Sequence, residues 1–91
     1  MNRCLKMLIN IEKWEDRWGA QIQAQAKKLD IEGVMQALDG HQMRIMICGK
    51  DANLDEFVDY LYDFFISINV RVEELEPFIK ERDFRGIFRV L

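Results

Sequence analysis

Residues 12–18 gather charged and aromatic side chains that could do chemistry. The run reads EKWEDRW, so three carboxylates, two cations and two indoles stand together. It separates a segment with strand-like alternation from a segment with helix-like composition. Such a junction often binds an anion, because the start of a helix carries partial positive charge. The acids Glu12, Glu15 and Asp16 oppose that use.

Two interpretations of these acids remain open. In the first, Glu15 and Asp16 lie at the helix start and neutralise from within the site that an anion would occupy. In the second, they are solvated charges of the first helical turn, where the dipole stabilises each by roughly 0.3–1 kcal/mol. A carboxylate about 4 Å from a phosphate oxygen costs roughly 4 kcal/mol at an effective dielectric near 20. Both interpretations therefore predict weak phosphate binding.

Alternating apolar residues predict the strands that must position this run. Residues 4–11 form the first strand, with Leu5, Met7, Ile9 and Ile11 toward a core. Asp39-Gly40 is a strong hairpin signal between two such segments, and Pro77 ends a later strand or confines it to a sheet edge. The further strands are expected at 33–38, 43–49, 69–78 and 84–91.

Helical spacing predicts two helices. The first has an apolar stripe of Trp18, Ile22, Ala26 and Leu29. In the second, Asn53 is expected as N-cap, with Glu56 completing a capping box. Its wide apolar stripe comprises Leu54, Phe57, Val58, Leu61, Phe64, Phe65 and Ile68, and its solvated face is expected to comprise Asp59, Tyr60, Tyr62 and Asp63.

The order of elements is β-α-β-β-α-β with an extra short C-terminal strand. Two helices on one face of a mainly antiparallel sheet make the ferredoxin-like α+β sandwich. A chain of 91 residues suits one domain, so residues 1–91 are expected to fold together.

Several segments resemble the acylphosphatase family. The best match is AKKLDIEGVMQALDG at 26–40, which is similar to that family's helix end, glycine, second strand and Asp-Gly hairpin. The match continues through ICGKDANLDEF at 47–57. It ends at FRGIF, 84–88, which is similar to the family's closing Phe-x-Gly-Phe. These landmarks span about two-thirds of the chain, and their order and spacing carry the resemblance.

The resemblance implies hydrolysis of carboxyl-phosphate anhydrides without metal or cofactor. In the family, a glycine-rich loop and an arginine bind the phosphate, and an asparagine on the second strand orients the attacking water. Carried over by position, Gly19 stands where the arginine is expected and Ala37 where the asparagine is expected. Arg17 and Gln36 are the fallback candidates. The site is therefore predicted to be degenerate.

The sequence thus favours a protein without catalytic activity that binds a partner protein, itself or an unidentified small ligand. The first alternative is an active acylphosphatase with Arg17 as the phosphate-binding residue. Losing one positioned donor to a developing charge typically costs a factor of about 10²–10³ in rate. The second alternative is a small-ligand regulatory module.

The sheet face opposite the helices is the predicted interaction surface, since two helices cover only one face. Leu8, Met46 and Cys48 fall on it, together with either Phe88 or the pair Ile87 and Leu91. Cys4 and Cys48 are expected to be neighbours there. In a cytoplasmic setting, they are expected as reduced thiols.

The remaining aromatic and imidazole groups have structural interpretations. One of Trp14 and Trp18 is expected in the core and the other over the loop, rather than as a ligand-stacking pair. His41, beside the Asp-Gly turn, is expected to be a solvated turn residue.

Composition excludes several classes of function. The net charge is −3, which argues against a nucleic-acid binder, and the third strand offers no aromatic ring for base stacking. No apolar run approaches the roughly 20 residues of a membrane span. With two cysteines, one histidine and no CxxC pair, a zinc site is not expected. We expect no cofactor, no metal, no membrane partner and a cytoplasmic location.

Overall fold

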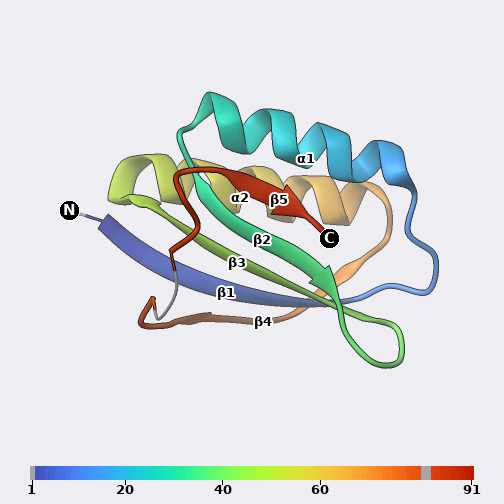
Figure 1. Ribbon diagram of the computed structural model, residues 1–91. Helices are drawn as coiled ribbons and strands as arrows, with labels where there is room; N and C mark the ends of the chain where they lie inside the picture. Colours follow the sequence, from blue (N-terminus) through green and yellow to red (C-terminus); the bar gives the residue numbers. More distant parts are fainter. Residues whose placement is uncertain (1, 81–82) are drawn as a thin grey trace.

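The computed structural model describes residues 2–80 and 83–91. Within them the chain forms two helices and five strands (Figure 1). The strands are β1 (Asn2–Asn10), β2 (Glu32–Ala37), β3 (Gln42–Lys50), β4 (Arg71–Pro77) and β5 (Phe88–Val90), and the helices are α1 (Asp16–Lys28) and α2 (Asp51–Ser67).

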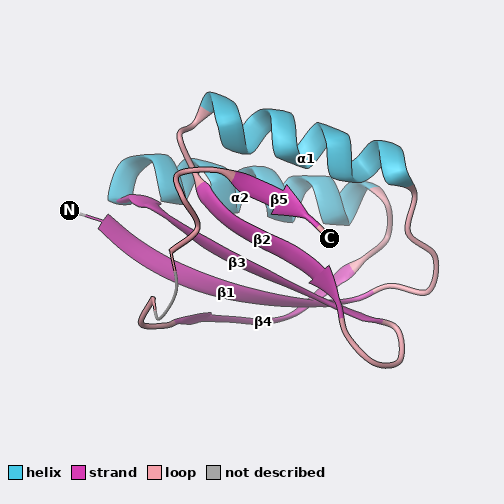
Figure 2. Cartoon of the chain, viewed as in Figure 1, coloured by secondary structure: helices cyan, strands magenta, loops and turns pink. Residues whose placement is uncertain are grey.

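The five strands form one sheet in the order β4-β1-β3-β2-β5. β5 runs parallel to β2, and the other neighbours are antiparallel. Both helices lie on the same side of this sheet (Figure 2). This confirms the predicted ferredoxin-like α+β sandwich with its extra short C-terminal strand.

The main core fills the space between the sheet and the helices. Met7 and Ile9 of β1 are fully buried there, as are Ile45 and Ile47 of β3. The helices contribute the side chains that their apolar stripes predict, and Ile22, Ala26, Leu54, Phe57, Leu61 and Phe65 are all fully buried. Alternation and helical period therefore predicted this core correctly.

The start of α2 differs from the prediction. The helix begins at Asp51 with Lys50 as N-cap, and no side chain caps it, so the capping box at Asn53 is wrong. β3 runs straight to Lys50, so the helix starts as soon as the strand ends. Asp51 supplies the first-turn carboxylate, and Arg3 forms ion pairs with Asp51 and Asp55.

The tyrosines of α2 are also less exposed than predicted. Tyr60 and Tyr62 are half-buried and pack against the main core, whereas Asp59 and Asp63 are exposed. The Tyr60 ring stacks on Phe57 with 6.0 Å between centroids. Burial raises the pKa of the Tyr60 phenol above its usual value.

The last two strands are shorter than predicted. β4 lies at a sheet edge and ends at Pro77, as a residue without an amide hydrogen requires. β5 starts at Phe88 and not at 84, because Arg85 and Gly86 adopt positive φ angles of 59° and 70°. That turn brings the chain alongside β2.

Cys4 and Cys48 are exact partners in the register of β1 and β3, with 4.1 Å between their Cα atoms. The prediction that they are neighbours is confirmed. The prediction of reduced thiols is wrong for this structure, because the two sulfurs form a disulfide. Pairing of the two strands alone brings the side chains within bonding distance.

Candidate functional site

The loop at 11–15 joins β1 to α1, as the sequence predicted. Glu15 is the N-cap residue of α1, but its side chain makes no capping hydrogen bond. Its Oε1 instead pairs with Arg17 Nε at 2.9 Å. Asp16 is the first helical residue and is exposed. The first interpretation of these acids required the Glu15 carboxylate to occupy the helix start. The structure places it on Arg17 instead.

Two positions were considered for the phosphate-binding arginine, Arg17 and Gly19, and they lie in contrasting environments. The Arg17 side chain is 71% exposed and bound to Glu15. Gly19 is buried inside α1, where an added Cβ would lie 3.1 Å from Val90 Cγ1 and 3.6 Å from the Trp14 ring. The missing side chain lets α1 approach β5. A side chain at this position would require a small shift of Val90, so Gly19 is a close packing contact between α1 and β5.

The candidates on β2 lie on opposite faces of the sheet. Ala37 pairs with Met43 of the main core and lines a hollow of about 190 Å³ together with Ile11 and Trp14. This hollow adjoins the loop after β1. Gln36 pairs with Arg44 on the other face, since successive strand residues alternate. Beside the loop, β2 therefore presents a methyl group and not an amide.

The two tryptophans contact each other edge to face, with 5.5 Å between ring centroids and 76° between planes. Both are half-buried, and Trp14 packs against the main core. No parallel slot for a planar ligand exists between rings in this geometry. His41 is exposed in the turn after β2, as predicted, and its carbonyl accepts a hydrogen bond from the Ile11 amide.

The predicted interaction face needs correction at two residues. Cys48 is only 3% exposed, because Phe78 and Phe84 pack over this part of the sheet. Phe88 belongs to the main core on the other face, where its ring contacts Phe57 edge to face. Ile87 and Leu91 are the exposed alternative, at 47% and 71%. Leu8 and Met46 remain half-buried.

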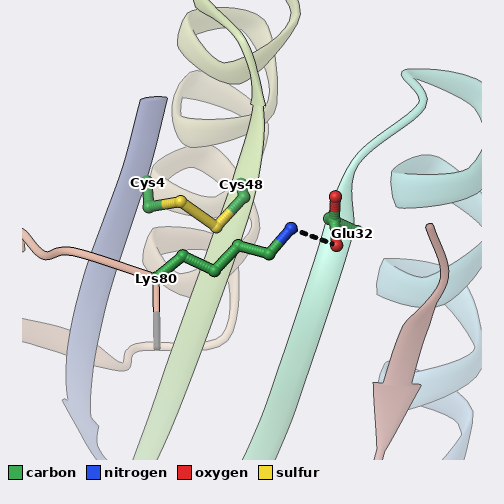
Figure 3. The surroundings of a disulfide bond; sticks show 4 residues. All are labelled: Cys4, Glu32, Cys48 and Lys80. Atoms are coloured by element: carbon green, nitrogen blue, oxygen red, sulfur yellow. Dashed lines mark hydrogen bonds and ion pairs between the residues drawn. A yellow bond between two sulfur atoms is a disulfide. The ribbon is translucent and has the colours of Figure 1, made fainter. Parts of the chain in front are cut away.

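Sequence reasoning missed the chain segment that covers the open face. After β4, the Lys80 side chain reaches across the sheet to β2, where its Nζ bonds Glu32 Oε2 at 3.1 Å (Figure 3). The only local signal was the pair of aromatic residues, Phe78 and Phe84, flanking the polar run KERD. Because the segment shows neither alternation nor helical spacing, its sequence did not predict which face of the sheet these two side chains would contact.

A cavity of about 630 Å³ lies between α1 and the chain around β5. Ala20, Ala24 and Ile87 supply apolar lining, and Gln23 Nε2 donates to the Phe88 carbonyl beside it at 2.9 Å. Among residues 2–80 and 83–91, no three His, Cys, Asp or Glu side chains gather as metal ligands would. Within the same residues, neither helix is long and apolar enough to cross a membrane.

No family model matches the chain, and no curated protein sequence does. Solved structures are similar to it. An acylphosphatase from Coxiella burnetii matches with a TM-score of 0.72 and 15% identity, over 99% of this chain and 93% of that one. An acylphosphatase from Bacillus subtilis matches with a TM-score of 0.68 and 16% identity, over 100% and 99%.

A bacterial light-regulated adenylyl cyclase also matches, with a TM-score of 0.65 and 20% identity, over 100% of this chain but 28% of that one. The chain therefore has an acylphosphatase-like fold, which the sequence predicted. At these identities the likeness describes the fold and leaves the chemistry to the residues of the site.

Proposed function

We propose that this protein is an acylphosphatase-like domain without acyl phosphate hydrolysis, and that it works by binding another protein or a second copy of itself. The observation that carries the proposal is the alternation along β2. Ala37 lines the hollow beside the loop, whereas Gln36 lies across the sheet. No β2 amide is therefore in place to orient a water molecule.

The phosphate side of the site supports the same proposal. Gly19 supplies no guanidinium, and the nearest substitute, Arg17, already pairs with Glu15. A phosphate would have to compete with that carboxylate in exposed surroundings, where charge pairs are worth about 1 kcal/mol or less. Glu12 and Asp16 add two more exposed carboxylates around the loop.

The test is hydrolysis of benzoyl phosphate by the purified protein. We expect the rate to equal hydrolysis in buffer alone for the wild type, for Arg17→Ala and for Arg89→Ala. Arg89 is the matched control, because it is an exposed arginine that pairs with Val34 on the open face. Turnover that Arg17→Ala abolishes and Arg89→Ala leaves intact would establish the alternative, an active acylphosphatase using Arg17.

We place the contact surface for this binding role on the uncovered part of the open face, around Leu8 and Met46. Sedimentation velocity over a range of concentrations tests self-association. We expect Leu8→Lys to abolish association or partner capture, and Ile66→Lys, on the far side of α2 and 68% exposed, to leave it unchanged. A strictly monomeric protein that captures no partner contradicts the binding role.

The second alternative is a small-ligand module, and the 630 Å³ cavity beside α1 is the observation that favours it. Thermal shift with phosphate, nucleotides and amino acids at millimolar concentration tests it. A shift that Ala24→Trp removes would assign the ligand to this cavity. A cytoplasmic location is part of our proposal, and in that compartment a disulfide is usually transient or redox-sensing.

A further inference from the structure

Arg44 lies on β3, the central strand of the sheet, and faces away from the helices (Figure 1). Its register partners are Leu8 on β1 and Gln36 on β2. The residue is half-buried, and its Nε is buried without a hydrogen-bond partner. No other buried side-chain nitrogen or oxygen in the described part of the chain lacks a partner. Arg44 is therefore an exception that its surroundings must explain.

The unpartnered Nε–H group of Arg44 weakens the fold. A buried donor that finds no acceptor has lost its hydration and gained nothing in return. Folded proteins satisfy nearly all of their buried polar groups for this reason. Side chains that lower stability in this way are typical of binding sites, where the ligand brings the missing partner.

Arg44 lines a hollow of about 170 Å³ on the open face. Leu8 and Leu38, both half-buried, provide its apolar walls, and Lys6 and Glu74 complete its lining. Sites for small molecules usually measure about 300–1,000 Å³. This hollow therefore has room for one side chain of another protein rather than for a metabolite.

The charges around the hollow favour a carboxylate. Lys6 is already paired with Glu76 at 2.9 Å, whereas Arg44 forms no ion pair with any residue that the structure describes. Glu74 is exposed on the edge strand β4 and is the register partner of Leu8, so Leu8 stands between Glu74 and Arg44 across the sheet. A guanidinium suits a carboxylate well, because two parallel hydrogen bonds can join them.

We propose that Arg44 binds an aspartate or glutamate side chain of a partner protein, which enters the hollow between Leu8 and Leu38. Apolar side chains beside that carboxylate pack on Leu8 and on Met46, the next residue of β3 on the same face. This assignment rests on the binding role proposed above. It adds the chemistry of the partner's surface, namely one acidic side chain among apolar neighbours.

The first test uses butyrate, which reproduces the glutamate side chain, and butyramide, its uncharged counterpart. The readout is an NMR titration of the Arg44 guanidinium, with Arg89, an exposed arginine on the same face, as control. We expect butyrate to shift the Arg44 resonances saturably, with half-saturation at roughly 10–100 mM. Neither Arg89 nor the butyramide titration should saturate. No saturation at Arg44, or equal behaviour of the two arginines, overturns the site.

Inorganic phosphate is the second probe in the same titration. Phosphate is expected to bind Arg44 more weakly than butyrate, because its charge would lose hydration against the apolar walls of Leu8 and Leu38. Tighter binding of phosphate than of butyrate would overturn a protein carboxylate as the occupant.

The second test asks whether Arg44 serves binding or the fold. Arg44→Met keeps a long apolar side chain and removes the unpartnered donor, so its melting temperature should exceed that of the wild type by about 4 °C or more. Arg89→Met should melt within about 2 °C of the wild type. An unchanged or lower melting temperature for Arg44→Met would show that the arginine supports the fold, and would overturn the inference.

The third test separates this inference from the binding role on which it rests. Where the protein captures a partner, Arg44→Met should weaken capture more than about tenfold, and Arg89→Met should leave it unchanged. Capture that survives Arg44→Met contradicts the inference and leaves the binding role intact. A wild type that neither self-associates nor captures a partner contradicts the binding role, and the butyrate and melting results then judge the Arg44 site alone. A dimer that Arg44→Met and Glu74→Gln both dissociate would replace the partner protein by a second copy.

Discussion

The two faces of the sheet bury apolar side chains by different means. On one face, two amphipathic helices cover Met7, Ile9 and Ile45 completely. On the other, Phe78 and Phe84 pack with Val34 and Cys48, and the Cys4–Cys48 disulfide joins β1 to β3 in the same cluster. The helix side has the larger cluster, with most of its side chains fully buried, whereas the loop side has a smaller cluster that a loop, not a helix, closes. We therefore expect the first face to set stability and the second to respond to conditions.

The largest loss of stability is expected for Phe57→Ala on the helix side. Phe57 is fully buried and contacts both Tyr60 and Phe88. Truncating such a ring costs about 3–5 kcal/mol in unfolding free energy, measured by urea denaturation. Ile66→Ala, on the same helix but 68% exposed, is the control and should change little. Similar losses from both would show that this face is loosely packed.

Removing the disulfide is expected to cost somewhat less. Its cysteines are 44 residues apart, and closing a loop of that size stabilises by about 2–4 kcal/mol, chiefly through the unfolded chain. The variant Cys4→Ala with Cys48→Ala should show this loss in urea. A reductant should destabilise the wild type by a similar amount and leave the double variant unchanged. A wild type that ignores the reductant would contradict this account.

Phe84→Ala compares the second face directly with the first. We expect a loss of about 1.5–3 kcal/mol, the transfer term alone, because a cover made by a loop can collapse over the space left behind. Ile79→Ala, which is 87% exposed in the same segment, serves as control. A loss equal to that of Phe57→Ala would remove the distinction between the two faces.

The smallest effect concerns alkaline pH. Because burial raises the pKa of Tyr60, folding favours the neutral phenol. This contribution is complete below about pH 10, the unfolded value, and is lost as pH rises through the folded-state pKa. Tyr60→Phe should therefore lose less stability than wild type between pH 9 and pH 11, measured by denaturation. A pH profile of Tyr60→Phe identical to that of the wild type would contradict the assignment.

The helix-side face was predictable because its signals are local. β1 alternates, and α2 repeats its apolar residues at helical spacing, so each residue's neighbours in sequence disclose its direction. The start of α2 was predicted wrongly because the helix begins where β3 ends, and not at an N-cap supplied by Asn53. Phe88 was left open between two faces because three residues of strand follow a turn whose direction only Arg85 and Gly86 set.

The candidate site divides in the same way. Sequence reasoning placed Glu15 and Asp16 at the start of α1 and Ala37 on β2, and the structure has them there. It did not predict that Gly19 packs on Val90, or that Glu15 binds Arg17 instead of the helix start. The Gly19 contact joins α1 to β5, and the Glu15 contact selects one side-chain rotamer among several. Neither produces a periodic pattern in the sequence.

By itself the sequence determined the order of elements, the helix-covered face and the neighbouring positions of Cys4 and Cys48 on two adjacent strands. These depend on period and register, which neighbouring residues specify. Only the tertiary structure decided that Phe78, Lys80 and Phe84 return over the disulfide and that Gly19 is a packing contact. Such contacts depend on where distant segments meet, and that is fixed by the packing of the whole chain.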